Sequence, residues 1–250
     1  MPHLAFHMSI ARALANIMGN RVIESDRGAF YLGSTGPDMH VLSRTQRISS
    51  HYFDLDCLEC QDSRASFFET RGELRDVTKL DDPTAAFVAG YLTHLVIDEV
   101  WITDIYRPFF GPASSLHGDG RANVLDRILQ YEMELQRRMD RPVMEEILRE
   151  LAAGKPALNV AFLDPEMLAR WRDIVVEMVS RPPTWDRFDR TASRFLAVAG
   201  VSTEEEVNEF MKTLPSLLEE TKAHVGSERI EDFVNKANAV ALKTLEEYLA

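Results

Sequence analysis

The chain has 250 residues, of which 45% are hydrophobic and 27% are charged, proportions that are ordinary for a soluble globular protein. Its formal net charge of -12 argues against a nucleic-acid polymer or an anionic membrane surface as a routine partner. No uninterrupted apolar run approaches the roughly 20 residues of a membrane span. The opening residues, MPHLAFHMSIARAL, lack the basic leader of a signal peptide. We therefore expect a cytoplasmic protein without stable membrane insertion.

The first predicted element is an amphipathic helix in HLAFHMSIARAL, which places His7 among apolar residues. A loop is expected over 32–50, where YLGSTGPDMH is rich in glycine and carries a proline. The next long element is a helix from Pro83 to about Phe110, with Asp82 as its N-cap. Apolar residues cover most of the circumference of this helix, which indicates burial on nearly all sides.

Helix-start signals recur in the second half of the chain. Asp164 precedes Pro165, and Thr203 stands three residues before Glu206, the spacing of a capping box. Alternating strand patterns with hairpin turns are nearly missing. We therefore predict an all-α fold of about eight to ten helices at typical helix lengths.

The domain organisation follows from repeats, linkers and the placement of histidines. The chain shows no 20–50-residue repeat and no low-complexity linker, so we predict a single multi-helix domain over 1–250. Six of the seven histidines lie in the first 117 residues. We expect the functional motifs in 1–110 and a helical scaffold or cover over 111–250. Cys57 and Cys60 lack the second half of a zinc knuckle, and we interpret them as incidental rather than as a functional pair.

The long apolar helix carries two polar residues on one face. His94 and Asp98 are four residues apart in AGYLTHLVIDEVW, and Gly90 lies one turn earlier on the same face. A mid-helix glycine costs about 1 kcal/mol relative to alanine, which is tolerated where another backbone or a bound group approaches closely. Burying the polar pair is also unfavourable unless each member finds a partner. Two explanations remain open: a hydrogen-bonded pair in the core, or two ligands of a metal ion.

A metal site needs further nitrogen and oxygen donors, and three segments offer them. Asp38 lies in GSTGPDMH, His51 lies in RISSHYF, and His7 lies on the first helix. Each has an ordinary alternative: turn chemistry for Asp38, a partly buried surface position for His51, and a satisfied core histidine for His7. Imidazole and carboxylate donors suit zinc, and manganese or iron would fit the same donors.

Taken together, the motifs resemble a known family. MPHLAFHMSIA, YLGSTGPD, SSHYF and AGYLTHLVIDEVW occur in this order in the zinc-dependent phospholipase C family, which includes phospholipase C/D domains and is distantly similar to the S1/P1 nucleases. The resemblance covers roughly residues 1–110. It implies an all-α, phospholipase C/P1 nuclease-like fold. It also implies one zinc site formed by Asp38, His51, His94 and Asp98.

The resemblance further implies a second metal ion beside the first. His7 would bind this ion, and Asp98 would bridge the two. His3, four residues before His7, would substitute for the N-terminal tryptophan that is a ligand in secreted members. The histidines and glutamate of the family's third metal site have no visible counterpart here. We therefore expect one or two zinc ions per chain and not three.

The implied activity is that of a metal-dependent hydrolase acting on a phosphoester, in particular a phosphodiester, of a small molecule or a lipid headgroup. A zinc-bound water would be the nucleophile, with its pKa lowered to about 7. Asp38 would orient or deprotonate that water. Arg44 and Arg47 would hold the substrate phosphate, unless they are solvated surface charges. The alternative is a non-catalytic metal-binding or interaction domain that retains the zinc cage for stability.

Overall fold

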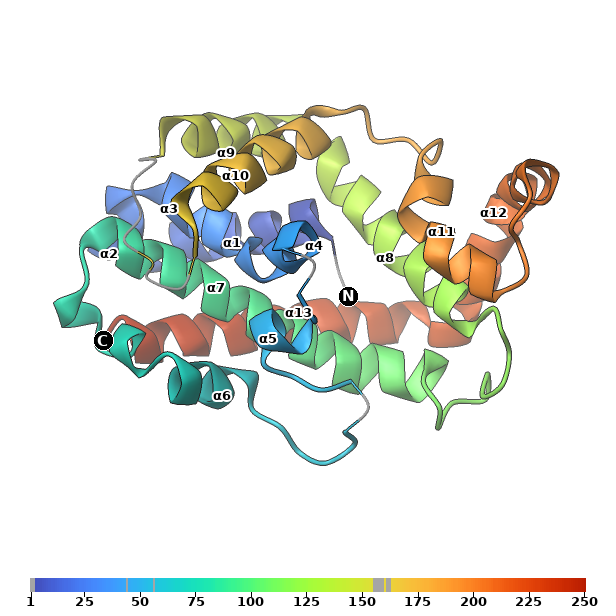
Figure 1. The fold of residues 1–250 in the computed structure, drawn as a ribbon, viewed down its shortest axis with the longest axis horizontal. Coiled ribbons are helices and arrows are strands. Elements are labelled where there is room, and N and C mark those ends of the chain that lie inside the picture. Colours follow the sequence, from blue (N-terminus) through green and yellow to red (C-terminus); the bar gives the residue numbers. More distant parts are fainter. Residues whose placement is uncertain (1–2, 44, 56, 155–159, 161–162) are drawn as a thin grey trace.

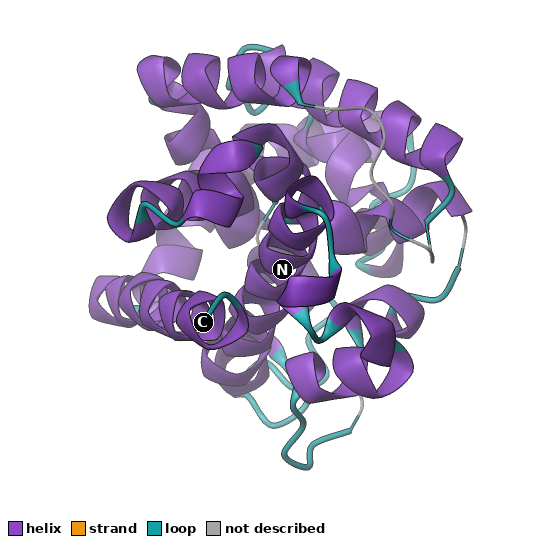
Figure 2. Ribbon diagram, turned by 90° about the vertical axis from the view of Figure 1, so that its left-hand side faces the viewer, coloured by secondary structure: helices purple, strands orange, loops and turns teal. Residues whose placement is uncertain are grey.

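The structure is a computed structural model, and it describes residues 3–43, 45–55, 57–154, 160 and 163–250. Every regular element in these residues is a helix, as Figures 1 and 2 show, and the all-α prediction is confirmed. The α-helices are α1 (Leu4–Met18), α2 (Arg21–Ser25), α3 (Arg27–Gly33), α4 (His40–Ser43), α5 (Ile48–His51), α6 (Ser63–Thr70), α7 (Asp82–Trp101), α8 (Ala122–Met139), α9 (Arg141–Ala153), α10 (Pro165–Ser180), α11 (Phe188–Val198), α12 (Glu204–Val225) and α13 (Ser227–Tyr248). Three 3-10 helices and one π-helix complete the set: η1 (Gly36–Met39), η2 (Gly72–Leu74), η3 (Val77–Lys79) and η4 (Ile102–Phe110).

The predicted number of helices was too low because several helices are short. Helices α2 to α6 have only four to eight residues each. Such lengths hold one or two turns, which is too little for a helical period to stand out in the sequence. The segment 32–50, predicted as a loop, contains η1, α4 and the start of α5. The single-domain organisation stays a prediction.

Helix α7 is the central element of the fold. Of its 20 residues, 17 are buried, and it packs against α1, α2, α3, α6 and α13. Figure 1 shows α13 running alongside α7, with α1 and α3 above them and α9 and α10 forming the upper layer. The prediction of a helix buried on nearly all sides is confirmed. This burial fixes the orientation of every side chain that α7 presents to its neighbours.

The ends of this helix differ in detail from the prediction. The N-cap is Asp81 rather than Asp82, since the Asp81 carboxylate accepts a hydrogen bond from the Thr84 amide at 2.8 Å. Proline is tolerated at either of the first two helical positions because neither amide has a partner within the helix. At the other end the helix continues to Phe110, but its last nine residues form the π-helix η4, with Pro108 inside it.

The segment Asp82–Phe110 is also long and apolar enough to cross a membrane, with a mean hydropathy of 1.3. Within the molecule, however, 94% of the apolar window is buried. The central helix of a globular core meets the same length and composition criteria as a membrane span. Its burial by other helices accounts for its apolar composition here.

Helices α3 and α7 approach so closely that each needs a glycine at the contact. A Cβ atom on Gly90 would lie 2.0 Å from the Phe30 carbonyl oxygen, and one on Gly33 would lie 2.0 Å from the Phe87 carbonyl oxygen. The expectation that another backbone approaches Gly90 is confirmed. The contact also carries the end of α3, with Ser34, onto the face of α7 that holds His94.

The helices of the second half enclose this arrangement. Helix α8 packs against α1, α11 and α12, and α9 packs against α3 and α10. The predicted starts are confirmed: Asp164 caps α10 by accepting from the Glu166 amide at 3.0 Å. Thr203 and Glu206 form the capping box of α12.

Candidate metal centre

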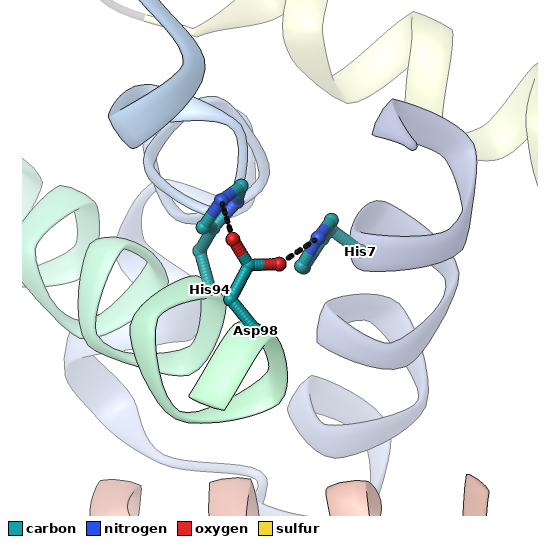
Figure 3. Close-up of side chains that lie close together, drawn as sticks. All are labelled: His7, His94 and Asp98. Atoms are coloured by element: carbon teal, nitrogen blue, oxygen red, sulfur yellow. Dashed lines mark ion pairs between the residues drawn. The ribbon is translucent and has the colours of Figure 1, made fainter. Parts of the chain in front are cut away.

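Three of the predicted ligands meet between α1 and α7. His94 and Asp98 come from successive turns of α7, and His7 comes from the first turns of α1 (Figure 3). All three side chains are buried. Each offers a ligand atom within 4.8 Å of those of the others. In Figure 3 the Asp98 carboxylate lies between the two imidazole rings and points one oxygen at each.

A second group of donors adjoins the first and shares His94 with it. Asp38 of η1 and His51 of α5 offer ligand atoms within 4.8 Å of each other and of His94. The Tyr91 hydroxyl on α7 donates to the Ser50 carbonyl at 2.6 Å, which holds α5 against the central helix. The structure thus brings together His7, Asp38, His51, His94 and Asp98 from four elements.

Backbone carbonyls orient both imidazoles of the second group. His94 Nδ1 lies 2.8 Å from the Ser34 carbonyl oxygen, and His51 Nδ1 lies 2.9 Å from Ser50 Oγ and 3.3 Å from the Arg47 carbonyl oxygen. A carbonyl can only accept a hydrogen bond, so Nδ1 is the donor and a neutral ring keeps its lone pair on Nε2. The two Nε2 atoms face each other at 3.3 Å. Two lone pairs at that distance require a proton or a metal ion between them.

The Asp98 carboxylate divides its oxygens between the two sides of the cluster. Its Oδ1 lies 3.4 Å from His7 Nε2, and its Oδ2 lies 3.4 Å from Nε2 of both His51 and His94. A carboxylate with one oxygen turned to each ligand group has the arrangement of a bridge between two metal ions. This agrees with the bridging role that the family resemblance implies.

Several polar atoms in the cluster have no hydrogen-bond partner. Both ring nitrogens of His7 and the Oδ1 atom of Asp98 are buried without one among the residues that the structure describes. Leaving a buried polar group unpaired costs about 1–3 kcal/mol. These orphaned atoms are nitrogen and oxygen donors of the kind that zinc prefers. The residues present therefore fit a metal ion at this position.

The charges of the cluster favour a cation. Burial lowers the pKa of His51 to about 4 and also lowers the pKa of His7, so both rings stay neutral, the form that binds metal. Burial acts to lower the pKa of His94 as well, but the charges of Asp98 and Asp38 outweigh it and leave that pKa raised. For the Asp98 carboxyl, burial acts to raise the pKa, yet His94 and His7 hold it well below its usual range. The carboxylate is thus ionised and positive charge is favoured at the shared position.

Asp38 differs from the other ligands in its exposure. Its side chain is 26% exposed, whereas the other four are buried. Burial acts to raise the pKa of the Asp38 carboxyl, but His94 and His51 outweigh it and lower that pKa below its usual range. Asp38 is therefore an ionised carboxylate at the solvent edge of the cluster.

Of the two arginines predicted to bind phosphate, Arg47 lies at the cluster. Its Nη2 atom donates to Asp98 Oδ2 at 3.0 Å, and its side chain is 18% exposed. The alternative interpretation of Arg47 as a solvated surface charge is wrong, because this guanidinium is mostly buried against a predicted ligand. Arg44 lies outside the described residues.

His3 stands apart from both ligand groups. It is the N-cap of α1, with extended backbone angles, so its side chain does not follow the helical spacing that would align it with His7. Burial lowers its pKa to about 3, and its Nε2 atom is buried without a hydrogen-bond partner. His3 was expected to act as a metal ligand in place of the N-terminal tryptophan, but neither donor group includes it. Among the described residues, Cys57 and Cys60 join neither group either.

One residue that the sequence did not single out supports His7 from the second half of the chain. Glu134 of α8 is buried, and its Oε2 atom accepts hydrogen bonds from the amides of Ala5 at 2.8 Å and Phe6 at 3.2 Å. It therefore caps the N-terminus of α1, where no residue of α1 itself does so. Burial raises its pKa to about 7. More than 120 residues separate the partners, so no local sequence signal marks this contact.

Comparison with known families agrees with the fold and the donor set. The family model described as zinc dependent phospholipase C matches residues 6–180, which is well over half of the chain. The chain belongs to the zinc dependent phospholipase C family. No curated protein and no solved structure matches it.

This match is wider than the motifs suggested. The sequence motifs placed the resemblance in 1–110, whereas the matched region also includes α8, α9 and α10. Membership of this family supports a metal-dependent phosphoester hydrolase in general. The buried histidine and aspartate cluster is compatible with that activity.

Proposed function

We propose that the chain hydrolyses a phosphodiester at a centre of one or two zinc ions. The proposed ligands are His7, Asp38, His51, His94 and Asp98. The observation that carries the proposal is the open edge of the cluster, where the partly exposed Asp38 and the Arg47 guanidinium lie. In a purely structural zinc site, protein ligands fill every coordination position, and a neighbouring cation has no role in binding the metal. A hydrolytic site needs access for water and positive charge for a phosphate.

In this proposal each residue has a distinct task. Zinc, when bound, would supply a water of lowered pKa and would stabilise charge on the phosphoryl oxygens. Asp38, at the solvent edge, accepts a hydrogen bond from the attacking water and orients it. Its lowered pKa makes it a weak base, so it orients the water rather than retaining its proton. The Ser34 carbonyl holds the His94 ring through Nδ1, as outer partners of zinc ligands commonly do.

Arg47 is proposed to bind the substrate phosphate. A guanidinium has five donors in a planar fork that matches phosphate oxygens. One of these donors is bound to Asp98, and another, Nη1, lies 3.4 Å from the Phe53 carbonyl oxygen. Arg47 thus neutralises the cluster on the side where Asp38 is exposed. A negatively charged phosphodiester that reaches Asp38 therefore meets this guanidinium.

The proposed substrate is a small-molecule or lipid-headgroup phosphodiester. The net charge of -12 disfavours long polyanions. A single phosphate group requires only local positive charge, which the metal ions and Arg47 would supply.

The test is hydrolysis by the zinc-loaded protein of bis(4-nitrophenyl) phosphate and of phosphatidylcholine in mixed micelles. Arg47→Gln should lower kcat/KM by about 10- to 100-fold, since charged hydrogen bonds contribute about 1.5–3 kcal/mol, while zinc content stays unchanged. Arg64→Gln is the matched control, because Arg64 lies on α6 and pairs with Glu247. Full zinc occupancy without turnover of either substrate would contradict the proposal and favour the non-catalytic cage.

A further inference from the structure

A separate cavity of about 70 Å³ lies where the start of α1 meets α8, the end of α10 and the start of α11. Its charged lining consists of three arginines and one glutamate: Arg138, Arg181, Arg187 and Glu134. The lining is therefore net positive, although the whole chain carries a charge of -12. Such a local reversal of charge in a concave site is typical of anion binding.

We propose that this cavity binds an anionic phosphate or carboxylate group, and that the group belongs to the substrate. The first part stands on the cavity alone, whereas the second part rests on the proposed function. Neither part depends on the metal ligands themselves, since none of the five proposed ligands lines the cavity.

Arg138 carries most of the argument because its charge is buried. The residue is only 9% exposed, and its Nε atom is buried with no hydrogen-bond partner in the described part of the chain. Its Nη2 atom donates to the carbonyl oxygens of Arg181 and Pro182, and among the described residues no carboxylate lies within ion-pair distance of it. A buried guanidinium is strongly disfavoured without an anionic partner. A bound anion would provide one.

The single carboxylate in the cavity, Glu134, fills that role only in part: the charge of Arg138 acts to lower the Glu134 pKa, but burial outweighs it and raises that pKa to about 7. Glu134 uses Oε2 to accept from the amides of Ala5 and Phe6, so it serves the N-terminus of α1. Arg181 pairs with Glu177 on α10, and Arg187 is exposed at the start of α11 with no ion pair among the described residues. Arg187 thus offers an anion in the cavity a guanidinium without an ion pair among the described residues, and Arg181 adds a second positive charge that it shares with Glu177.

The position of the cavity links it to the metal centre. His3 lines the cavity, and its carbonyl oxygen accepts the first helical hydrogen bond of α1 from the His7 amide at 3.3 Å. One helical turn, about 5.4 Å, therefore separates a cavity residue from a proposed metal ligand. A phosphodiester at the centre could extend a second anionic group around this turn. The inferred substrate class is a phosphodiester that carries a further phosphate or carboxylate.

The first experiment measures binding of inorganic phosphate by isothermal titration calorimetry at constant ionic strength. It compares the purified wild-type protein with the double variant Arg181→Gln/Arg187→Gln and repeats both titrations after EDTA treatment. We expect one phosphate site that survives EDTA in the wild type and binds at least tenfold more weakly in the double variant, because each charged hydrogen bond to phosphate contributes substantially. Arg190→Gln is the control, since Arg190 is exposed on α11 outside the cavity lining.

Two results would overturn the anion site. One is equal phosphate affinity in the wild type and the double variant, and the other is the absence of any site beyond the EDTA-sensitive one. Both variants replace side chains at the protein surface or cavity mouth, and circular dichroism verifies that they fold. The phosphate titration involves no catalysis, so its result tests the anion site even if the protein hydrolyses no phosphodiester.

The second experiment identifies the source of the anion. It compares ethyl 4-nitrophenyl phosphate with the same diester carrying a terminal phosphate on its ethyl group. If the substrate supplies the anion, the phosphorylated diester has a KM at least tenfold lower in the wild type, and the double variant loses this advantage while Arg190→Gln keeps it. Equal KM values for the two diesters would refute the assignment to the substrate and leave a site for a free anion.

Discussion

Two buried aspartates of the same core have opposite surroundings. Asp98 and Asp126 are both only 2% exposed. The Asp126 oxygens each accept from a neutral donor, Trp101 Nε1 at 3.1 Å and Gln130 Nε2 at 2.7 Å, and the Arg127 guanidinium is farther away, with its Nε atom 3.9 Å from Oδ2. The Asp98 oxygens face imidazole nitrogens at 3.4 Å, and within the described residues their one close donor is Arg47. Burial of a carboxylate therefore does not mark a metal site, whereas a shortage of donors around it does.

The difference predicts what each aspartate needs to be stable. Asp126 is satisfied by the protein itself, as buried polar groups usually are. Asp98 shares its surroundings with His7, whose two ring nitrogens find no hydrogen-bond partner among the described residues. A cation between these groups would remove several unpaired buried atoms at once.

The largest expected effect separates the two aspartates by substitution. Asp98→Asn keeps the shape of the side chain but removes its charge and one strong oxygen donor. We expect loss of at least one metal ion per chain and a fall in phosphodiester hydrolysis of more than about 100-fold, since even outer partners of metal ligands contribute 10- to 100-fold. Metal content by mass spectrometry and turnover of bis(4-nitrophenyl) phosphate measure both effects.

Asp126→Asn is the matched control. Its new amide NH₂ faces one of the two donors, Trp101 Nε1 or Gln130 Nε2, so the variant should lose about 1–3 kcal/mol of unfolding free energy while it keeps its metal. If Asp98→Asn also kept its full metal content and lost only stability, the two aspartates would be equivalent. The His94–Asp98 pair would then be an ordinary core hydrogen-bonded pair.

Removal of the metal by a chelator should distinguish the two aspartates through the thermal stability of their variants. A metal at 100 to 1,000 times its dissociation constant stabilises the folded state by about 3–4 kcal/mol. For a chain of this size we expect EDTA to lower Tm by roughly 5–15 °C. Differential scanning calorimetry should find the same shift in Asp126→Asn and little of it in Asp98→Asn. An EDTA-insensitive wild-type Tm would argue against a metal that contributes to folding.

Because of its histidines, the metal-free protein should lose stability steeply as the pH falls. Burial lowers the pKa of His51 from 6.5 to about 4. Between these values the unfolded chain binds a proton that the folded chain does not, so stability falls as pH falls from 6.5 towards 4. The loss reaches about 3 kcal/mol for this one group. The raised pKa of His94 acts in a different window, above pH 6.5, where stability is lost as pH rises.

Urea unfolding of EDTA-treated protein at pH 6.5 and 4.5 measures this loss of unfolding free energy. His51→Gln removes the titrating ring, so the variant should lose less stability between the two pH values than the wild type. Parallel losses in the two proteins would show that His51 does not have the lowered pKa on which the argument depends.

The smallest expected effect concerns the orientation of a ligand. Ser50→Ala removes the hydroxyl that lies 2.9 Å from His51 Nδ1, while the Arg47 carbonyl stays at 3.3 Å. We expect zinc to bind about tenfold more weakly, at the lower end of the range for outer partners of metal ligands. Competition with a chromogenic chelator measures this affinity. Ser49→Ala is the control, because its hydroxyl donates to the Gln46 carbonyl outside the cluster; equal affinities in the two variants would contradict the role of Ser50.

Much of the fold could be predicted from the sequence because its signals are local. Residues within a single helix predict each of three features: the apolar circumference of α7, the starts of α10 and α12, and the glycine at the α3 contact. The short helices of 20–70 could not be predicted because two turns show little periodicity. The N-cap of α7 moved by one residue because adjacent aspartates precede Pro83 and either could cap the helix.

The candidate site divides in the same way. Four motifs pointed to the residues that meet at the cluster, since histidines and aspartates are conspicuous in apolar segments. The supporting contacts were not visible, because the Ser34 carbonyl carries no side-chain signal and Glu134 reaches α1 from more than 120 residues away. His3 was predicted from its position four residues before His7; it lies at an N-cap with extended backbone angles and belongs to neither donor group, so its role as a ligand stays a prediction.

The most direct test of the central claim is an anomalous difference map at the zinc absorption edge. The crystals should come from protein purified without chelator. We predict one or two zinc peaks per chain, about 2.0–2.2 Å from the nitrogen and oxygen donors of His7, Asp38, His51, His94 and Asp98. Zinc bound elsewhere, or a metal-free protein in which Asp38 or His51 points away from His94, would contradict the account.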